Sequence, residues 1–390
     1  MCSKVSYELY LKENQFERVS HFCSLDYHLE KALKIDEISG GVILPAKESK
    51  NGTQGGIVSK KGDEWHFYEH SSLHRHFGGK YDFNPDEAII RDEAVVYIGL
   101  WNPVWGHCLT DNIKHLWFLS ENRYAHLKKL KWVYIATSDF DSSNFLSLLS
   151  KIIGTTDLSN IVRCDCLTQY KTIYLPDDCL EYSEREYFYT TNYQRLIESV
   201  LASDNYHDPD SPKNIYFSRT KLPVGWHRDT GEKKIEKLFK RLGYTIYYPE
   251  RMTLDEQLKV LYNCESFATT EGSISHNALF LKNGAHLVCL RKSAYINNYQ
   301  FSINQMKMLR VTLIDANLTL PSDEPWFKPF FMYVSPQLRA WAKIRHSFFP
   351  AFQYLVYLYR FEPKFAHFRR AAKRRLLRLL HPNPSREQQL

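Results

Sequence analysis

The segment TTEGSISHNALF, residues 269–280, lies between two short apolar runs at residues 266–269 and 286–291. This order predicts a strand, a polar turn, a helix and a second strand. Ser273 or Ser275 is placed to cap the helix, and the free backbone N–H groups of a helix N-terminus attract phosphate. An ordinary capped helix in an α/β domain is the alternative interpretation of this segment taken alone.

Strands and helices alternate on both sides of a polar segment, residues 203–213, which is predicted to be a linker. Before it, strands are expected at residues 94–100, 131–136 and 171–175, with helices at 110–127, 142–153 and 186–201. After it, strands are expected at residues 214–217, 244–248, 266–269, 286–290 and 310–315, with helices at 232–242, 254–264 and 274–281. The alternation predicts an α/β protein of two doubly wound lobes that face a cleft.

Several motifs of the second series occur in a fixed order. Residues 214–219 read NIYFSR, residues 244–250 read YTIYYPE, and residues 252–257 read MTLDEQ, before the Glu271-Gly272-Ser273 turn. This order resembles glycosyltransferase family 61, over roughly residues 95–292 and most firmly over 214–292. The resemblance implies the GT-B fold, with two Rossmann-like lobes. Many members have His-Gly-Ala in place of Glu271-Gly272-Ser273, and this departure favours a bacterial branch that builds capsular polysaccharide or lipopolysaccharide.

The resemblance and the linker together suggest a division of the chain. Residues 1–205 are expected to form an acceptor-side α/β lobe with an irregular, β-rich start. Residues 206–335 are expected to form a Rossmann-like lobe that binds the nucleotide sugar. Residues 336–390 are expected to form a basic amphipathic helical tail.

Ligands of open α/β sheets bind outside the carboxyl ends of the strands, so residues there are the nucleotide-site candidates. Arg219 follows a strand and is the first candidate for the diphosphate, because its guanidinium fits phosphate oxygens; a surface salt bridge is the alternative. Glu250 and Glu271 follow two further strands and could accept hydrogen bonds from ribose hydroxyls. The full set of expected nucleotide-sugar-binding residues is Ser218, Arg219, Glu250, Glu271, Gly272, Ser273, His276 and Asn277.

The segment WNPVWGHCLTD, residues 101–111, leads from a strand end into a predicted helix on the acceptor side. Inverting displacement of a nucleoside diphosphate requires a base beside the acceptor hydroxyl, and His107 has the right intrinsic pKa. Asp111 is the second candidate for the base, although it could instead cap the helix. Trp101 and Trp105 could stack on a sugar ring, and burial in the core is the equal alternative.

A metal site competes with this interpretation. Asp139-Phe140-Asp141 has the Asp-x-Asp form that holds Mn²⁺ in the other major glycosyltransferase fold, and hard cations favour clustered carboxylates. The same residues could cap the helix expected from Ser142. The double α/β layout argues against metal dependence, so we expect no metal and no cofactor, with the nucleotide sugar as a substrate.

Composition and the tail bear on location. The chain has 390 residues, of which 44% are hydrophobic and 24% charged, and its net charge is +7. Its eight cysteines are scattered along the sequence, which favours a reducing, cytoplasmic compartment. Phe365, Phe368, Ala372, Leu376 and Leu379 share one face of a predicted basic helix, which indicates binding at the inner face of the cytoplasmic membrane. Docking on the first lobe and nucleic-acid binding are the alternatives, and we expect no nucleic acid.

The sequence therefore predicts an inverting, metal-independent glycosyltransferase. It would move a sugar from a nucleotide donor, expected to be a UDP-sugar, to a lipid-linked saccharide, capsule or lipopolysaccharide acceptor. A polysaccharide pyruvyl transferase of similar shape and a non-catalytic scaffold of a polysaccharide assembly complex remain as alternatives.

Overall fold

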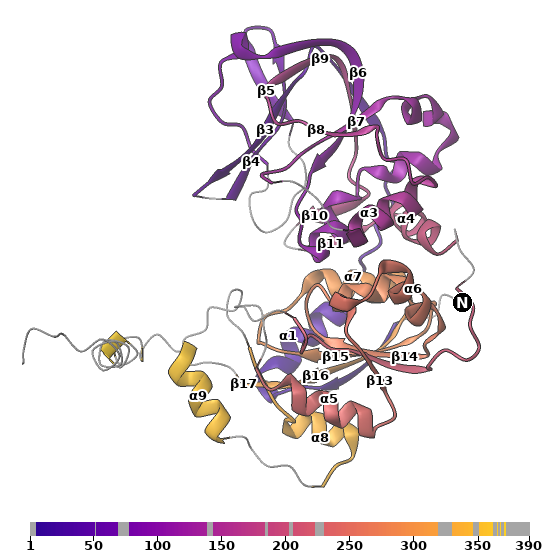
Figure 1. The fold of residues 1–390 in the computed structure, drawn as a ribbon, viewed down its shortest axis with the longest axis vertical. Coiled ribbons are helices and arrows are strands. Elements are labelled where there is room, and N and C mark those ends of the chain that lie inside the picture. Colours follow the sequence, from indigo (N-terminus) through magenta and orange to yellow (C-terminus); the bar gives the residue numbers. More distant parts are fainter. Residues whose placement is uncertain are drawn as a thin grey trace, which may run out of the picture.

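The structure is a computed structural model that describes most of the chain. The described residues are 5–50, 52–68, 78–138, 143–183, 186–202, 206–222, 230–318, 330–345, 351–361, 365, 367, 370 and 371. They fold around two large sheets, each of which lies in its own body of the molecule (Figure 1). This is a mixed α/β protein with parallel strands in both sheets. The GT-B arrangement itself stays a prediction.

The lower body in Figure 1 is built on a six-stranded sheet in the order β1-β16-β15-β14-β12-β13, with every neighbouring pair parallel. Its strands are β12 (Asn214–Phe217), β13 (Thr245–Tyr247), β14 (Ser266–Thr270), β15 (His286–Arg291) and β16 (Arg310–Asp315), together with β1 (Ser6–Tyr10). Helices α5 (Glu232–Arg241), α6 (Leu254–Asn263), α7 (Asn298–Met306) and α8 (Pro336–Ala342) surround this sheet. Apart from β1, its strands follow the predicted ranges closely.

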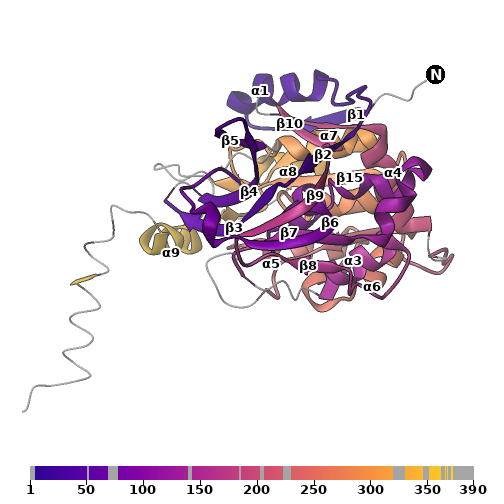
Figure 2. The ribbon, with the colours of Figure 1, turned by 90° about the horizontal axis from the view of Figure 1, so that it is seen from above.

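The first strand of the chain belongs to this second body. β1 pairs with β16 from Ser6↔Arg310 to Tyr10↔Ile314. The helix α1 (Glu13–Ser24) then packs against α7, where the rings of Phe22 and Phe301 lie 5.6 Å apart; Figure 2 shows α1 and β1 beside α7. β1 and α1 therefore belong to the second body, although the sequence predicted residues 1–205 as the first lobe, because residues 6–24 bury their apolar faces on the second body.

The upper body holds the other sheet, which is mixed rather than doubly wound. Its order is β5-β4-β3-β9-β6-β7-β8, with β2 on β9. The strands are β2 (Ile35–Ser39), β3 (Val42–Ser49), β4 (Gly52–Lys61), β5 (Glu64–Tyr68), β6 (Ile89–Leu100), β7 (Lys131–Ile135), β8 (Ile161–Arg163) and β9 (Thr168–Pro176). Strands β6 to β9 run parallel, whereas β2 to β5 pair antiparallel. The prediction of two doubly wound lobes is thus wrong for this body.

Two predicted helices of the first body are different in the structure. Residues 105–129 run through short turns, α2 (Trp105–His107), a π turn (Cys108–Asn112) and 3₁₀ turns (Leu116–Ser120 and Asn122–Lys129), instead of one helix at 110–127. Asn112, Lys114 and His115 are buried here, and their side chains bond Asn102, Asp178 and the Pro176 carbonyl, respectively. Hydrogen bonds to these distant residues, and not the packing of one regular helix, therefore fix the conformation of this segment.

The helix predicted at 186–201 begins five residues later. The hairpin β10 (Leu180–Ser183) and β11 (Glu186–Tyr189) precedes α4 (Thr191–Ala202). The aromatic run at residues 187–189 suits a strand, and the Thr190 hydroxyl accepts from the Tyr193 N–H at 3.3 Å, which starts the helix. The other helix of this body, α3 (Ser143–Ile153), matches its prediction.

A shared hydrophobic core joins the two bodies. It contains Leu109 and Tyr193 from the first body and Phe280 and Tyr299 from the second. The Tyr193 and Tyr299 hydroxyls bond each other, and Tyr193 also donates to the Leu109 carbonyl at 2.7 Å. Because this core crosses the boundary, the ends of the second sheet and the turn after β6 are held together.

The tail is described only in part. Helix α9 (Ala351–Phe361) contacts the second body through Tyr357, which is buried against Phe331, and it stands at the side of the molecule in Figure 1. Phe368, Ala372, Leu376 and Leu379 lie outside the described residues. No helix in the described part of the chain is both long and apolar enough to cross a membrane.

Candidate functional site

The carboxyl ends of the parallel strands in the second sheet carry a row of polar residues. Arg219 follows β12, Glu271 follows β14, Arg291 ends β15 and Asp315 ends β16. The registers Phe217↔Thr269 and Arg291↔Asp315 place these strand ends side by side. This is the edge where ligands of parallel α/β sheets bind.

The turn after β12 is fixed by two carboxylates of α5. Ser218 is fully buried, and its hydroxyl donates to Glu236 Oε2 at 2.9 Å. Thr220 donates to the same oxygen at 2.6 Å, and the Arg219 N–H donates to Glu232 Oε1 at 3.1 Å. Ser218 is therefore a structural residue, which corrects its expected contact with the ligand. The half-buried Arg219 side chain starts from a rigid backbone.

Glu250 lies in a 3₁₀ turn, Pro249–Arg251, after β13. Its side chain is exposed. Partial desolvation raises the pKa of Glu250, whereas Arg251 and Arg219 act in the opposite direction and favour its charged form. Glu250 and Arg219 are thus neighbours at the sheet edge, and the exposed carboxylate also accepts backbone hydrogen bonds, as from Lys221.

The turn after β14 differs from the predicted helix N-terminus. Residues 275–280 form a 3₁₀ turn, Ser275–Phe280, whose N-cap residue Ile274 makes no side-chain capping bond. The predicted cap at Ser273 or Ser275 is therefore wrong, because Ser275 Oγ donates instead to the Gly272 carbonyl at 2.8 Å. Gly272 has φ +122°, a conformation that favours glycine.

A lysine lies over this turn. The Lys292 Nζ atom would be 3.4 Å from a Cβ atom built on Gly272, and it also lies over the Phe330 ring, 5.0 Å from its centre. Lys292 comes directly after β15. Since β14 lies between β12 and β15, Arg219 and Lys292 flank the Gly272 turn from the two neighbouring strands.

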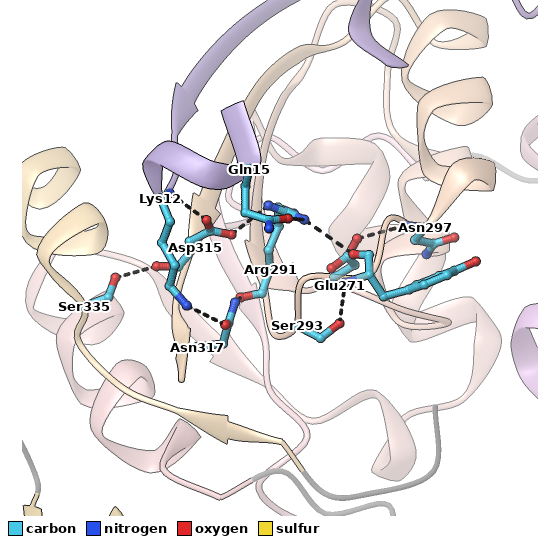
Figure 3. Close-up of polar contacts among 10 residues, drawn as sticks. Lys12, Gln15, Glu271, Arg291, Ser293, Asn297, Asp315, Asn317 and Ser335 are labelled. Carbon is cyan, nitrogen blue, oxygen red and sulfur yellow. Dashed lines mark hydrogen bonds and ion pairs between the residues drawn. The ribbon is translucent and has the colours of Figure 1, made fainter. Parts of the chain in front are cut away.

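Glu271 points into the second body instead of outward. It is 8% exposed, and its Oε1 accepts from the Asn297 N–H at 3.2 Å. Desolvation raises the pKa of Glu271, and the nearby Arg291 opposes that shift. Figure 3 shows the two side chains among the same polar contacts. Glu271 therefore bonds within the fold, and its expected contact with a ribose stays a prediction.

Arg291 and Asp315 form a buried ion pair. Their side chains are 2% and 1% exposed, with Arg291 Nη1 2.8 Å from Asp315 Oδ1. The N-terminal segment completes the pair, because the Lys12 N–H donates to Asp315 Oδ2 at 2.7 Å and Arg291 Nη2 lies 3.4 Å from Gln15 Oε1 (Figure 3). Arg291 Nη2 also donates to the Tyr295 carbonyl at 3.4 Å, which fixes the loop that carries Lys292 and Asn297.

His276 and Asn277 lie in the 3₁₀ turn and are both buried. The Asn297 Nδ2 group donates to His276 Nε2 at 2.9 Å, and His276 packs edge-on against Tyr299. Asn277 Nδ2 donates to the Ile274 carbonyl at 2.9 Å, while its Oδ1 accepts from Trp105 Nε1 at 3.0 Å. Asn277 is therefore a link between the two bodies.

His107 and Asp111 form a hydrogen-bonded pair on the other side of the boundary. His107 Nδ1 is 2.9 Å from Asp111 Oδ2, and their side chains are 26% and 13% exposed. Thr110 donates to the same carboxylate oxygen at 2.7 Å. With Nδ1 turned to the carboxylate, Nε2 of a neutral His107 is the basic nitrogen, which is the arrangement of an oriented general base.

Trp101 and Trp105 have separate roles. Trp101 is 3% exposed, stacks on Tyr134 with ring centres 4.0 Å apart and donates to the Ile98 carbonyl. Its expected role as a sugar platform is thus wrong, because the ring is part of the core. Trp105 is half-buried at the boundary, where it bonds Asn277.

Gly106 brings the two predicted halves of the site into contact. A Cβ atom on Gly106 would lie 2.7 Å from Ser273 Oγ and 3.4 Å from His276 Nδ1. The backbone beside His107 thus touches the turn at Gly272-Ser273. The sequence predicted residues on both sides, and the structure places them together.

The metal alternative falls on Asp139 and Asp141, which lie outside the described residues. Within the described ranges, no group of three or more His, Cys, Asp or Glu side chains is placed to hold a metal ion.

Sequence reasoning missed several residues of this site. Lys292 and Arg291 follow a predicted strand in the same way as Arg219, so the same strand-end argument could have found them. In the sequence, Glu232 and Glu236 look like ordinary charged residues of a helix, so their bonds to the turn after β12 were not predicted. Asn297 gave no sequence signal, because its importance comes only from its contacts with Glu271 and His276.

The fold and the strand-end site are consistent with the α/β glycosyltransferases. The family model Glycosyltransferase 61 matches residues 105–288, from Trp105 in the turn after β6 to Val288 in β15. This match supports assignment of the chain to glycosyltransferase family 61, and with it a glycosyltransferase activity at the general level. No curated protein matches the chain.

Proposed function

We propose that this protein is an inverting, metal-independent glycosyltransferase that uses a nucleotide sugar, with a UDP-sugar as the expected donor. The observation that carries the proposal is the contact of Gly106 with Ser273, because it sets the His107–Asp111 pair against the Gly272 turn. Direct displacement at the anomeric carbon requires the base beside the acceptor and the residues that bind the diphosphate to lie close together.

Arg219 and Lys292 are proposed to bind the diphosphate. Two cations from the strands on either side of Gly272 would supply the positive charge that a metal ion supplies elsewhere. The backbone N–H of Ser273 would add a hydrogen bond, whereas that of Gly272 donates to Ser275 Oγ at 3.3 Å. The exposed Glu250 beside Arg219 would accept from the ribose. Asn277 would hold Trp105 at the acceptor side.

In the proposed reaction, His107 accepts the proton of the acceptor hydroxyl through Nε2. The hydroxyl oxygen forms a bond to the anomeric carbon as the bond from that carbon to the diphosphate oxygen breaks. The electron pair of the broken bond leaves with the nucleoside diphosphate, beside Arg219 and Lys292. Asp111 holds the His107 ring and stabilises its positive charge.

The capsular or lipopolysaccharide acceptor and the position on the inner membrane face are also proposals. Leu355, Val356 and Tyr359 of α9 are 62%, 49% and 42% exposed, so this helix offers an apolar surface next to the basic tail. Such a surface binds anionic lipid interfaces. Co-sedimentation with vesicles of anionic and of neutral lipid tests it: the full chain should pellet with anionic vesicles, and the Leu355→Glu/Val356→Glu variant should stay in solution.

Thermal unfolding with a panel of nucleotides, each with EDTA and with Mn²⁺, tests the main proposal. A ligand at 100 times its Kd stabilises by about 2.7 kcal/mol, which raises Tm by a few degrees. We expect a metal-independent shift with UDP that is lost in Arg219→Ala and kept in Arg241→Ala, an exposed arginine of α5.

Other outcomes would contradict the proposal. A shift that appears only with Mn²⁺ would favour the Asp139 and Asp141 site. No shift with any nucleotide would favour pyruvyl transfer or a non-catalytic scaffold.

A further inference from the structure

The His276 ring has one satisfied and one unsatisfied nitrogen. Nε2 accepts a hydrogen bond from Asn297 Nδ2 at 2.9 Å. Nδ1 is buried and has no hydrogen-bond partner among the described residues. The side chain as a whole is 8% exposed, and Tyr299 packs edge-on against it with ring centres 4.7 Å apart.

These contacts define the tautomer. A neutral imidazole has one donor and one acceptor nitrogen, so an accepting Nε2 leaves the hydrogen on Nδ1. Desolvation lowers the pKa of His276 to about 3; the hydrogen bond with Asn297 opposes this shift, and the neighbouring His107 adds to it. His276 is therefore neutral at physiological pH, and its buried N–H has no acceptor within the described part of the chain.

The unsatisfied N–H points at the lobe boundary. Nδ1 would lie 3.4 Å from a Cβ atom on Gly106, which belongs to the other body. The Ser273 hydroxyl faces the same point, 2.7 Å from that Cβ position. Nδ1 thus lies at the place where the Gly272 turn and the His107 turn meet.

We propose that His276 Nδ1–H donates a hydrogen bond to an oxygen of the leaving diphosphate bound at the Gly272 turn, and that Asn297 is the positioning residue that fixes this tautomer. This inference rests on the proposed function, because it requires a diphosphate at the Gly272 turn. A neutral donor strengthens its hydrogen bond as the oxygen gains charge on cleavage of the anomeric C–O bond.

Asn297 can serve this role because its own position is fixed. Its backbone N–H is bound by the buried Glu271 carboxylate at 3.2 Å. Its loop is held at Tyr295 by Arg291, whose partner Asp315 is bound by Lys12. The polar network in Figure 3 therefore runs from the N-terminal segment to Asn297. Asn297 in turn bonds His276 and orients its one hydrogen-bond donor.

Titration calorimetry with UDP and with inorganic pyrophosphate tests the role of the donor. Phe in place of His276 removes the N–H and keeps a ring against Tyr299, so His276→Phe should bind UDP about tenfold more weakly. Asn has its amide nitrogen near the position of Nδ1, so His276→Asn should bind within about threefold of the wild type. His126→Asn, at an exposed histidine of the first body, is the control.

Nitrogen-15 NMR of histidine-labelled protein tests the tautomer without any activity. The resonances of His276 should be those of an Nδ1–H ring, and UDP or pyrophosphate should shift the Nδ1–H signal. An Nε2–H tautomer would overturn the inference. So would tight UDP binding by a folded His276→Phe variant, which would leave the proposed function intact, whereas a wild type that binds neither UDP nor pyrophosphate would defeat the proposed function itself.

Discussion

Lys292 is, with Arg219, one of the two cationic residues proposed to bind the diphosphate. Its ammonium group lies over the Gly272 turn, at the end of the strand next to β14. A hydrogen bond from a cation to a phosphate oxygen contributes about 1.5–3 kcal/mol. Lys292→Met should therefore weaken UDP binding about tenfold or more, as measured by calorimetry.

A matched control for Lys292 lies at the opposite end of the same strand. Lys282 is exposed and precedes β15, with its ammonium group 4.4 Å from the centre of the Tyr262 ring. Lys282→Met should bind UDP like the wild type. Equal loss in both variants would mean that general positive charge, and not the position of Lys292, attracts the nucleotide.

Glu186 makes stability depend on pH. One carboxylate oxygen is 3.5 Å from Asn298 Nδ2, and the other is buried with no hydrogen-bond partner in the described residues. Desolvation raises the pKa of Glu186 from 4.5 to about 7. The folded state thus holds a proton that the unfolded state loses, so this stability is present below pH 4.5 and declines as pH rises to about 7.

Glu186→Gln should remove this pH dependence. The variant should be more stable than the wild type at pH 7 by about 1 kcal/mol. The reason is that the amide is neutral at every pH, whereas the wild-type carboxylate must either stay protonated or carry its charge in a partly buried position. Urea unfolding from pH 4.5 to 7.5 measures the slope. Glu181→Gln, on the neighbouring strand of the same hairpin, is the control, and an unchanged slope in Glu186→Gln would show that another group titrates.

At the scale of elements, the row of strand ends depends on the buried pair of Arg291 and Asp315. Loss of one partner of a buried ion pair leaves an uncompensated charge and costs about 3–5 kcal/mol. Asp315→Asn should destabilise the protein by this amount in urea unfolding. The double variant Arg291→Met/Asp315→Leu should recover part of the loss, because it removes both charges.

An exposed ion pair gives the comparison for Asp315. Lys34 and Asp36 lie 3.2 Å apart with side chains 70% and 45% exposed. Asp36→Asn should cost less than about 1 kcal/mol. If Asp315→Asn costs no more than Asp36→Asn, the N-terminal segment does not hold the sheet edge as the structure indicates.

The elements that the sequence predicted best share one property. Strands β12 and β14 to β16 are short apolar runs between turn signals, and they are buried in the central sheet, so local pattern and tertiary burial agree. In the poorly predicted segment at residues 105–129, residues 105–119 are all buried or half-buried, so this part carries no amphipathic period. Its turns are fixed by partners such as Asp178 that lie far along the chain.

At the scale of the whole molecule, Gly106 and Ser273 are one point at which the two lobes meet closely. Ala at position 106 would place a Cβ atom 2.7 Å from Ser273 Oγ, so one side must move. Such overpacking costs about 1–3 kcal/mol. Gly106→Ala should lower the free energy of unfolding by this amount, measured in urea.

A double-mutant cycle identifies the contact. Ser273→Gly removes the atoms that the new Cβ atom would meet, so Gly106→Ala/Ser273→Gly should recover at least half of the loss. An additive double variant would mean that the two lobes do not touch at this point in solution.

The sequence by itself determined the α/β class, the second sheet apart from its first strand, the strand-end position of Arg219 and the family resemblance. These rest on local pattern and on spacing, which need no distant partner. Tertiary structure alone decided that β1 joins β16, that Ser218, Glu271 and Trp101 turn inward, and that Asn297 orients His276. Each of these depends on contacts between residues far apart in the chain, because burial and hydrogen-bond partners are fixed only when the lobes pack.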